Sequence, residues 1–146
     1  FLVLLKVHHL IPQLRSIAAW RMDDFAYTED ANVDQVMGAF FCIRREMWDK
    51  IGPMDDGFFL WYEEVDYCRR AINAGWNVRF FSQIVAKHKK GSSFDRVPTI
   101  KKQRALRRSV RRYMRKHYGA GVGIFFWIFE PVFLLTSFIA SVFKPM

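Results

Sequence analysis

The sequence has little cysteine, and acidic residues are almost missing from its C-terminal third. Only Cys42 and Cys68 occur among 146 residues, and neither has the spacing of a metal site or a disulfide framework. We therefore expect two buried thiols in a reducing compartment. Residues 87–116 hold 13 Lys or Arg against one acid, whereas the rest holds 10 basic and 13 acidic residues. The net charge of +9 thus belongs to one segment and does not describe the whole surface.

The opening of the chain lacks an uninterrupted apolar run. Lys6 ends the first run after five residues, which is too short for a membrane span. Pro12 and Arg15 do not fit a signal peptide with a small-residue cleavage site. The pattern leaves open a helix or a loop that leads to a membrane-near surface. Residues 21–34 are polar and acidic, which predicts a loop.

Residues 57–75 join an aromatic run to a helical pattern. Val65, Cys68 and Ile72 have the i, i+3, i+7 spacing of one apolar helix stripe. Gly75 stands where a C-terminal cap is expected. The sequence therefore predicts a central helix that ends near this glycine.

Three carboxylates fall in the first turn of this predicted helix: Glu63, Glu64 and Asp66. Acids at a helix start stabilise it, because free N–H groups and the helix dipole favour negative charge there. Asp66 would then pair with Arg69 or Arg70. Alternatively, neighbouring aromatic residues press one carboxylate into a partly dry cleft, where it takes a proton from a substrate hydroxyl. Spacing does not decide between these two interpretations.

The remaining pattern up to residue 88 alternates between strand and helix signals. Buried strands are predicted at 33–43, 76–81 and 84–88, the first interrupted by Gly38. A glycine inside a strand indicates a bulge or a close backbone approach. Residues 44–51 are predicted to form a short helix that stops at a Gly-Pro pair.

The C-terminal part combines a basic helix with an apolar run. Residues 99–117 predict a basic amphipathic helix whose cations face solvent beside a domain or bind anionic lipid head groups. Nucleic acid is not expected, because aromatic residues do not interleave with the charges and no binding motif occurs. Residues 123–143 are long enough to cross a membrane, but Glu130-Pro131 argues against a plain span and favours a re-entrant or interfacial segment. The preceding cations predict a cytoplasmic location.

Several short motifs occur in a fixed order between residues 33 and 118. They are Gly38-Ala39, Ile43-Arg44-Arg45-Glu46, Ile51-Gly52, Phe58-Phe59, Glu63-Glu64-Val65-Asp66-Tyr67-Cys68, Ala74-Gly75-Trp76 and His88-Lys89-Lys90-Gly91-Ser92-Ser93. Together they resemble the C-terminal half of a family 2 glycosyltransferase of the rhamnosyltransferase-like group.

The resemblance implies an α/β fold of the glycosyltransferase A type, with a mostly parallel sheet flanked by helices. Residues 1–97 would form the acceptor-side half, 98–118 the basic amphipathic helix and 119–146 a hydrophobic membrane-associated helix. The Asp-x-Asp motif of the nucleotide-binding half is absent from the sequence. We therefore expect the C-terminal part of a longer enzyme, inactive as this fragment.

The implied reaction transfers a sugar, with inversion, from a nucleotide-diphosphate donor to a hydroxyl of a glycan or lipid-linked acceptor. Cell-surface polysaccharide or glycolipid synthesis at the cytoplasmic face of the bacterial inner membrane is the expected setting. The alternative from another class is a non-catalytic, membrane-anchored basic module that binds anionic lipid or RNA.

The resemblance also assigns roles to individual residues. The base is the second residue of an acidic pair, usually Glu-Asp, and this maps onto Glu64 of a Glu-Glu pair here. Glu63 would hold an acceptor hydroxyl, and Asp66 would orient the helix. His88 would complete the coordination of a divalent metal, Mg or Mn, that the missing half mostly binds. The remaining substrate-binding candidates are Gly38, Ala39, Trp61, Tyr62, Gly91 and Ser92.

Overall fold

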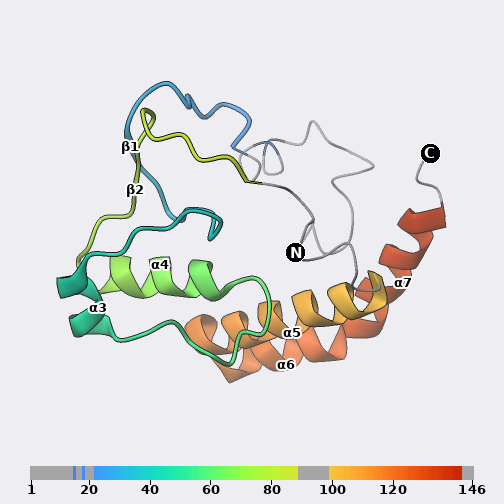
Figure 1. Cartoon of the computed structure of the whole chain (residues 1–146). Helices are drawn as coiled ribbons and strands as arrows, with labels where there is room; N and C mark the ends of the chain where they lie inside the picture. The colour runs from blue at the N-terminus through green and yellow to red at the C-terminus, as the bar shows by residue number, and fades with distance from the viewer. Residues whose placement is uncertain (1–14, 16–17, 19–21, 89–98, 143–146) are drawn as a thin grey trace.

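The computed structural model describes Arg15, Ala18 and the ranges 22–88 and 99–142, without the side chains of 99–100 and 137–142. Helices dominate these ranges, and only two residues at a time form strands (Figure 1). The elements are β1 (Ala31–Asn32), α3 (Arg45–Ile51), α4 (Glu63–Asn73), β2 (Arg79–Phe80), α5 (Thr99–Tyr118), α6 (Ala120–Ile128) and α7 (Glu130–Val142).

The central helix α4 forms where the sequence predicts it. It begins after Trp61 and Tyr62, which both have positive φ, at 58° and 74°. It ends before Gly75, whose φ of 85° is the left-handed conformation common at helix C-termini. The predicted stripe is partly wrong, because Ile72 is 39% exposed while Tyr67 is fully buried. Contacts with α3 and α5 turn this part of the helix inward.

A small core joins α3 to α4. Met47, Tyr67 and Ala71 are its buried members, and partly buried apolar side chains surround them. The surrounding residues are Phe41, Ile43, Ile51, Met54 and Trp76. Phe41 meets the ring of Tyr67 edge-on at 5.9 Å between centroids. The predicted helix at 44–51 is therefore confirmed, and its role is to cover one face of α4.

The expected sheet is not seen in the part of the chain that the structure describes. Ala31 pairs with Phe80 and Asn32 with Arg79 in one antiparallel ladder, and the three predicted strands are otherwise loop. The expectation of a mostly parallel α/β sheet is thus wrong for these residues. An apolar run forms a strand only where a neighbour continues its backbone pairing, and within the described residues the pairing of 33–43 ends at Val33, whose N–H donates to the Val78 carbonyl at 3.0 Å.

The missing strand also changes the position of one cysteine. Cys68 is buried on α4, as predicted, and burial raises the pKa of its thiol. Cys42 is exposed, because residues 33–44 run as a loop instead of a buried strand. The expectation of two buried thiols is therefore correct for Cys68 alone.

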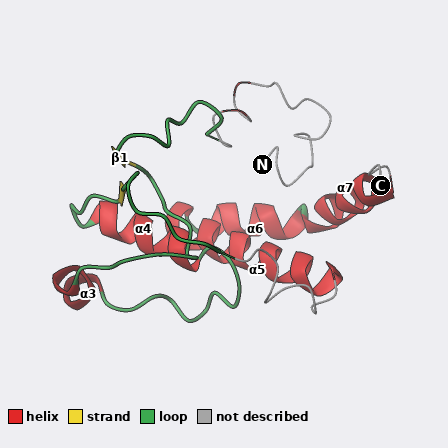
Figure 2. Ribbon diagram, turned by 45° about the horizontal axis from the view of Figure 1, so that its top comes forward, coloured by secondary structure: helices red, strands yellow, loops and turns green. Residues whose placement is uncertain are grey.

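The C-terminal part folds into three helices. The predicted basic helix is confirmed as α5, which lies alongside α6 (Figures 1 and 2). The predicted single hydrophobic membrane helix is wrong, because the chain breaks at Phe129 into α6 and α7. Pro131 explains the break, since proline is tolerated in the first turn of a helix but not in its interior. No helix among the described residues is long and apolar enough to cross a membrane.

The same substitution at two glycines tests the assigned helix ends. Neither Gly75 nor Gly121 has an atom within 4 Å of the position that a Cβ would occupy, but only Gly75 has positive φ. We expect Gly75→Ala to lower the free energy of unfolding by about 1 kcal/mol and Gly121→Ala, inside α6, to raise it by about 0.5–1 kcal/mol. Urea denaturation in a mild detergent measures both. Equal effects of the two substitutions would contradict the assigned helix ends.

Candidate functional site

Asp66 joins the central helix to the basic helix. Its side chain is fully buried, and two cationic side chains and one histidine surround the carboxylate. Arg70 Nε lies at 2.9 Å, Lys116 Nζ at 2.8 Å and His117 Nε2 at 2.8 Å from its oxygens. Burial alone would raise the pKa of Asp66, but the hydrogen bonds from Lys116, His117 and Arg70 outweigh it and lower the pKa. The Asp66–Arg70 pair confirms one prediction, and the lowered pKa favours the charged form of Asp66.

A second carboxylate, Asp55, binds cations of α5 from the loop before α4. We call Asp55, Asp66 and the side chains that bind them the clamp; these side chains are Arg70, Arg112, Lys116 and His117. Asp55 accepts hydrogen bonds from Arg112 Nη2 at 2.6 Å and from Lys116 Nζ at 2.8 Å. These bonds outweigh burial and hold the pKa of Asp55 far below its usual value. Lys116 therefore bridges both carboxylates. A Cβ on Gly57 would clash with the Arg112 guanidinium, so a larger residue here would displace that group from Asp55.

Two neutral contacts complete the attachment of α5. Ser109 Oγ donates to the carbonyl of Leu60 at 2.7 Å, and the rings of Tyr62 and Tyr113 lie 5.3 Å apart. These partners come from the strip of α5 that faces residues 55–66. Contacts from α5 thus hold the segment before α4, including the ring of Tyr62, in place.

Glu64 lies at the same helix start but in a different environment. Its carboxyl is partly buried, and burial together with the charge of Glu63 raises its pKa, although backbone N–H groups, including that of Gly38, partly offset this. Glu64 Oε2 is buried and has no hydrogen-bond partner within the described residues. The phenol of Tyr62 also feels this charge, since burial and Glu64 raise its pKa. Glu64 is therefore the carboxyl of this turn that is suited to accept a proton.

The structure brings together two residues that the sequence analysis selected separately. A Cβ on Gly38 would lie 3.6 Å from Glu64 Cβ, and the Gly38 amide bonds to the Glu64 carboxylate. Glu63 stands beside them with one buried oxygen, Oε2, that lacks a partner in the described ranges. Gly38 is exposed and part of a turn. The candidate site therefore consists of one glycine loop and the first turn of α4.

The other predicted site residues lie apart from this pair or outside the described residues. Ala39 follows Gly38 and is exposed, and Trp61 is partly buried at the strained start of α4. His88 is exposed, and the described ranges contain no group of three His, Cys, Asp or Glu side chains placed to hold a metal. Gly91 and Ser92 lie outside the described residues.

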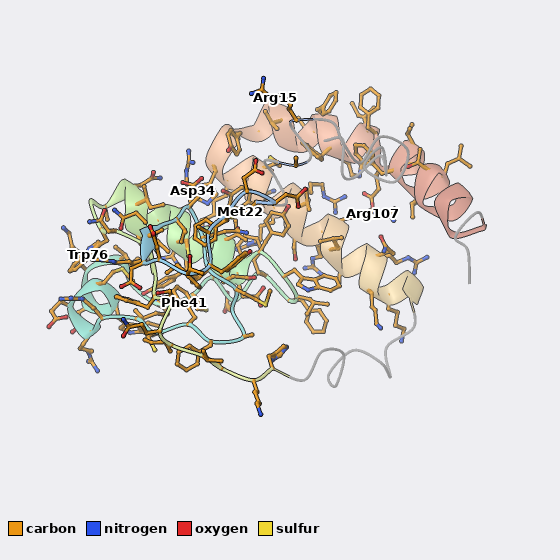
Figure 3. The ribbon with its side chains drawn as sticks, turned by 90° about the horizontal axis from the view of Figure 1, so that it is seen from above. Arg15, Met22, Asp34, Phe41, Trp76 and Arg107 are labelled. Carbon is orange, nitrogen blue, oxygen red and sulfur yellow. The ribbon has the colours of Figure 1, made fainter. Side chains whose placement is uncertain are left out.

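Sequence reasoning missed the cations that hold Asp55 and Asp66. Arg112, Lys116 and His117 were predicted only as members of a solvated or lipid-facing basic helix, or of its narrow apolar side. Their spacing of i, i+4, i+5 places them on one side of α5. That spacing is the available signal, but it does not identify the carboxylates that they meet. Figure 3 shows Phe41 and Trp76 near α4 and Arg107 farther along, on α5.

Comparison with known proteins adds no relative. No protein-family model matches the chain, and neither a curated protein nor a solved structure matches it. The glycosyltransferase assignment therefore depends on the ordered motifs and on the geometry around Glu64.

The clamp predicts a stability difference between two aspartates. Asp66→Asn should lower the free energy of unfolding at pH 7 by about 3 kcal/mol, because it removes the buried charge that pairs with the partly exposed Arg70 and Lys116. Asp49→Asn is the control, since Asp49 pairs with Arg45 on an exposed surface. It should cost about 0.5 kcal/mol or less. Urea denaturation of both variants in the same detergent measures the difference.

The pH dependence of this difference has a defined sign. The pKa of Asp66 is lowered on folding, so its stabilisation is complete above the unfolded value of about 3.9 and is lost as pH falls through the folded value. The gap between wild type and Asp66→Asn should therefore be constant from pH 7 to about pH 5 and shrink in acid. A gap that grows below pH 4 would contradict the buried ion cluster.

Glu64 should behave in the opposite way. Its pKa is raised on folding, so its contribution is most favourable below the unfolded value of about 4.3 and is lost as pH rises. Glu64→Gln should raise the free energy of unfolding at pH 7, by about 1 kcal/mol or less, with no gain near pH 4. Glu46→Gln, on the exposed surface of α3, should show no such gain. If Glu64→Gln lowers the free energy of unfolding equally at pH 7 and near pH 4, the raised pKa of Glu64 is contradicted.

Proposed function

We propose that this chain is the acceptor-side half of an inverting family 2 glycosyltransferase and that Glu64 is its base. The observation that carries the proposal is a partly buried carboxyl, at the position of the motif's acidic pair, with a raised pKa and one oxygen that lacks a partner among the described residues. Perturbed carboxyls of this kind gather at functional sites. The ordered motifs supply the reaction class, and the geometry supports the choice of residue.

The reaction requires a base on the acceptor side. As the acceptor hydroxyl attacks the anomeric carbon, Glu64 takes its proton while the nucleotide diphosphate leaves from the opposite face of the sugar. A raised pKa helps, because a base works best when its pKa lies near the operating pH. Backbone N–H groups, including that of Gly38, stabilise the charged carboxylate, and Oε2, which has no partner within the described residues, would take the proton.

Asp66 is unsuited to this role, although it belongs to the same motif. Its carboxylate is fully buried and already bonded to Arg70, Lys116 and His117. A carboxyl whose pKa is lowered in this way is a weak base. Asp66 instead orients the first turn of α4. Glu63 Oε2, which also lacks a partner within the described residues, is placed to hold an acceptor hydroxyl.

The aromatic residues before α4 would contact the acceptor sugar. Trp61 and Tyr62 have positive φ, a conformation that costs on the order of 1–3 kcal/mol and gathers at functional sites. The contacts of Ser109 and Tyr113 with this segment keep it in place. Strain maintained by surrounding contacts fits a segment whose side chains must be aimed at a ligand.

The donor half of the site would come from sequence that precedes this chain in a longer enzyme. Large apolar side chains remain exposed beside the site, with Met37 at 72%, Phe40 at 56% and Phe59 at 83%. Such a surface fits contact with a further part of the longer enzyme. His88 is exposed and has no clustered ligand among the described residues, so the side chains here do not form a metal site by themselves. No step is assigned to Mg or Mn.

A binding module for anionic lipid or RNA is the second candidate. The exposed cations of α5 favour it, and they lie apart from Glu64. This function does not need a carboxyl with a raised pKa beside a glycine loop. The two functions also do not exclude one another if the enzyme works at the cytoplasmic face of a membrane.

The test is turnover of the longer enzyme at saturating donor, acceptor and metal. Glu64→Gln keeps the size of the side chain but removes the base, so turnover should fall by roughly two to four powers of ten while donor binding persists. Glu63→Gln should mainly raise the acceptor KM. Near wild-type turnover of Glu64→Gln, with correct folding, would refute the assignment of the base.

A further inference from the structure

We propose that α6 and α7 lie flat in the boundary between the head groups and acyl chains of a bilayer that contains anionic lipid. The basic side of α5 then meets the lipid phosphates. This inference is independent of the transferase proposal, because it uses none of the residues around Glu64. It goes beyond membrane association by fixing the orientation of the helices and the side chains that enter the lipid.

The first observation is that α6 is apolar on all sides that α5 leaves free. Its buried residue, Gly123, packs against Arg115 of α5, where a Cβ would lie 2.8 Å from Arg115 Cβ. The large side chains around the rest of the helix are exposed by 38–64%. These are Ile124, Phe125, Trp127, Ile128 and Phe129. A helix that is apolar all round is stable only inside a large core or in lipid.

The second observation is that α7 continues this surface. Val132, Leu134 and Leu135 are exposed by 43–59%, while Phe133 is buried toward α5. The apolar surface therefore runs along α6 and the part of α7 whose side chains the structure describes, and Glu130, which is partly buried, is the one charged residue in it. Contiguous apolar surface of this extent marks an interaction site.

The third observation concerns Glu130, the single acid between residues 99 and 142. Its carboxylate is bonded to Arg111 of α5, and both side chains are about one third exposed. An ion pair turned toward α5 keeps the charge of Glu130 away from the apolar surface. The charge of Glu130, which is unfavourable in lipid, is thus compensated by Arg111 of the same chain.

Helix lengths favour an in-plane orientation. By a rise of 1.5 Å per residue, α6 is about 14 Å long and α7 about 20 Å, each well short of a hydrocarbon core of roughly 30 Å. The bend at Phe129 keeps the two from forming one span. Trp127 and Tyr118 are exposed by 64% and 53%, and such side chains favour the interface.

The fourth observation is a stripe of exposed cations on α5. Lys101, Arg104 and Arg108 follow at i, i+3 and i+7, which places them on one side of the helix. At 100° per residue this stripe lies about a quarter turn from the side that packs on α6. Packed helices are about 8–10 Å apart, so the stripe stands at phosphate level when α6 lies at the acyl boundary.

These features together favour anionic lipid over a protein or nucleic acid partner. A lipid surface offers an apolar interior beneath a layer of negatively charged phosphates. The apolar residues of α6 and α7 match the interior, and the cations of α5 match the phosphates. A nucleic acid would leave the apolar residues of α6 and α7 uncovered. A further protein segment over α6 would not require the cations beside it.

The experiment is flotation of the purified chain with phosphatidylcholine vesicles, with and without phosphatidylglycerol. A triple variant, Phe125→Ser, Trp127→Gln and Ile128→Gln, should reduce binding at least tenfold on both vesicles. Arg104→Glu with Arg108→Glu should reduce it at least tenfold on anionic vesicles at low salt but little on neutral ones. Arg45→Glu on the exposed surface of α3 is the matched charge control and should bind within twofold of wild type. Circular dichroism checks folding of each variant.

Quenching by brominated lipids tests the orientation. Bromines near the head group should quench fluorescence more than bromines at the chain ends, and Trp127→Phe should remove most of this effect. Stronger quenching from the chain ends would show a span and overturn the in-plane position. Unchanged flotation of the triple variant, or binding by this chain but not by the longer enzyme, would overturn the lipid surface. Glu64→Gln should float like wild type, so failure of the transferase proposal is distinguishable.

Discussion

The structure depends on one buried carboxylate, Asp66, that holds two helices together. A fully buried aspartate is costly unless its charge is balanced, and Arg70, Lys116 and His117 balance it. Because two of these partners come from α5, this ion cluster determines where the C-terminal helices sit. It also determines which face of α5 remains exposed. That face carries the stripe of cations that we propose to contact lipid.

The same helix turn separates two carboxylates into different roles. Asp66 faces α5 and has a lowered pKa, whereas Glu64 faces the Gly38 loop, with a raised pKa and one oxygen that has no partner in the described part of the chain. The two differ by two positions, about 200° around the helix, so they point to different sides. The pKa values of Asp66 and Glu64 shift in opposite directions within one turn. Helix α4 can therefore provide both a structural anchor and, on our proposal, a catalytic base.

Local signals in the sequence were sufficient for the helices but not for the sheet. The start of α4, its end at Gly75 and the basic face of α5 follow from spacing and capping residues. The strands predicted at 33–43 and 84–88 failed, because an apolar run does not specify the partner that must accept its backbone hydrogen bonds. The Asp66–Arg70 pair was predictable from i, i+4 spacing, but Lys116 and His117 are about 50 positions away and carry no local signal. The approach of Gly38 to Glu64 was predictable only through the resemblance of the ordered motifs.

One titration tests the central claim most directly. The side-chain carboxyl ¹³C shifts of Asp66 and Glu64 can be followed by NMR against pH in the detergent-solubilised protein. The account predicts that Asp66 titrates below its usual value of about 3.9 while Glu64 titrates above its usual value of about 4.3. Titration of both groups at their usual values, or shifts in the reverse order, would contradict the separation of anchor and base at the start of α4.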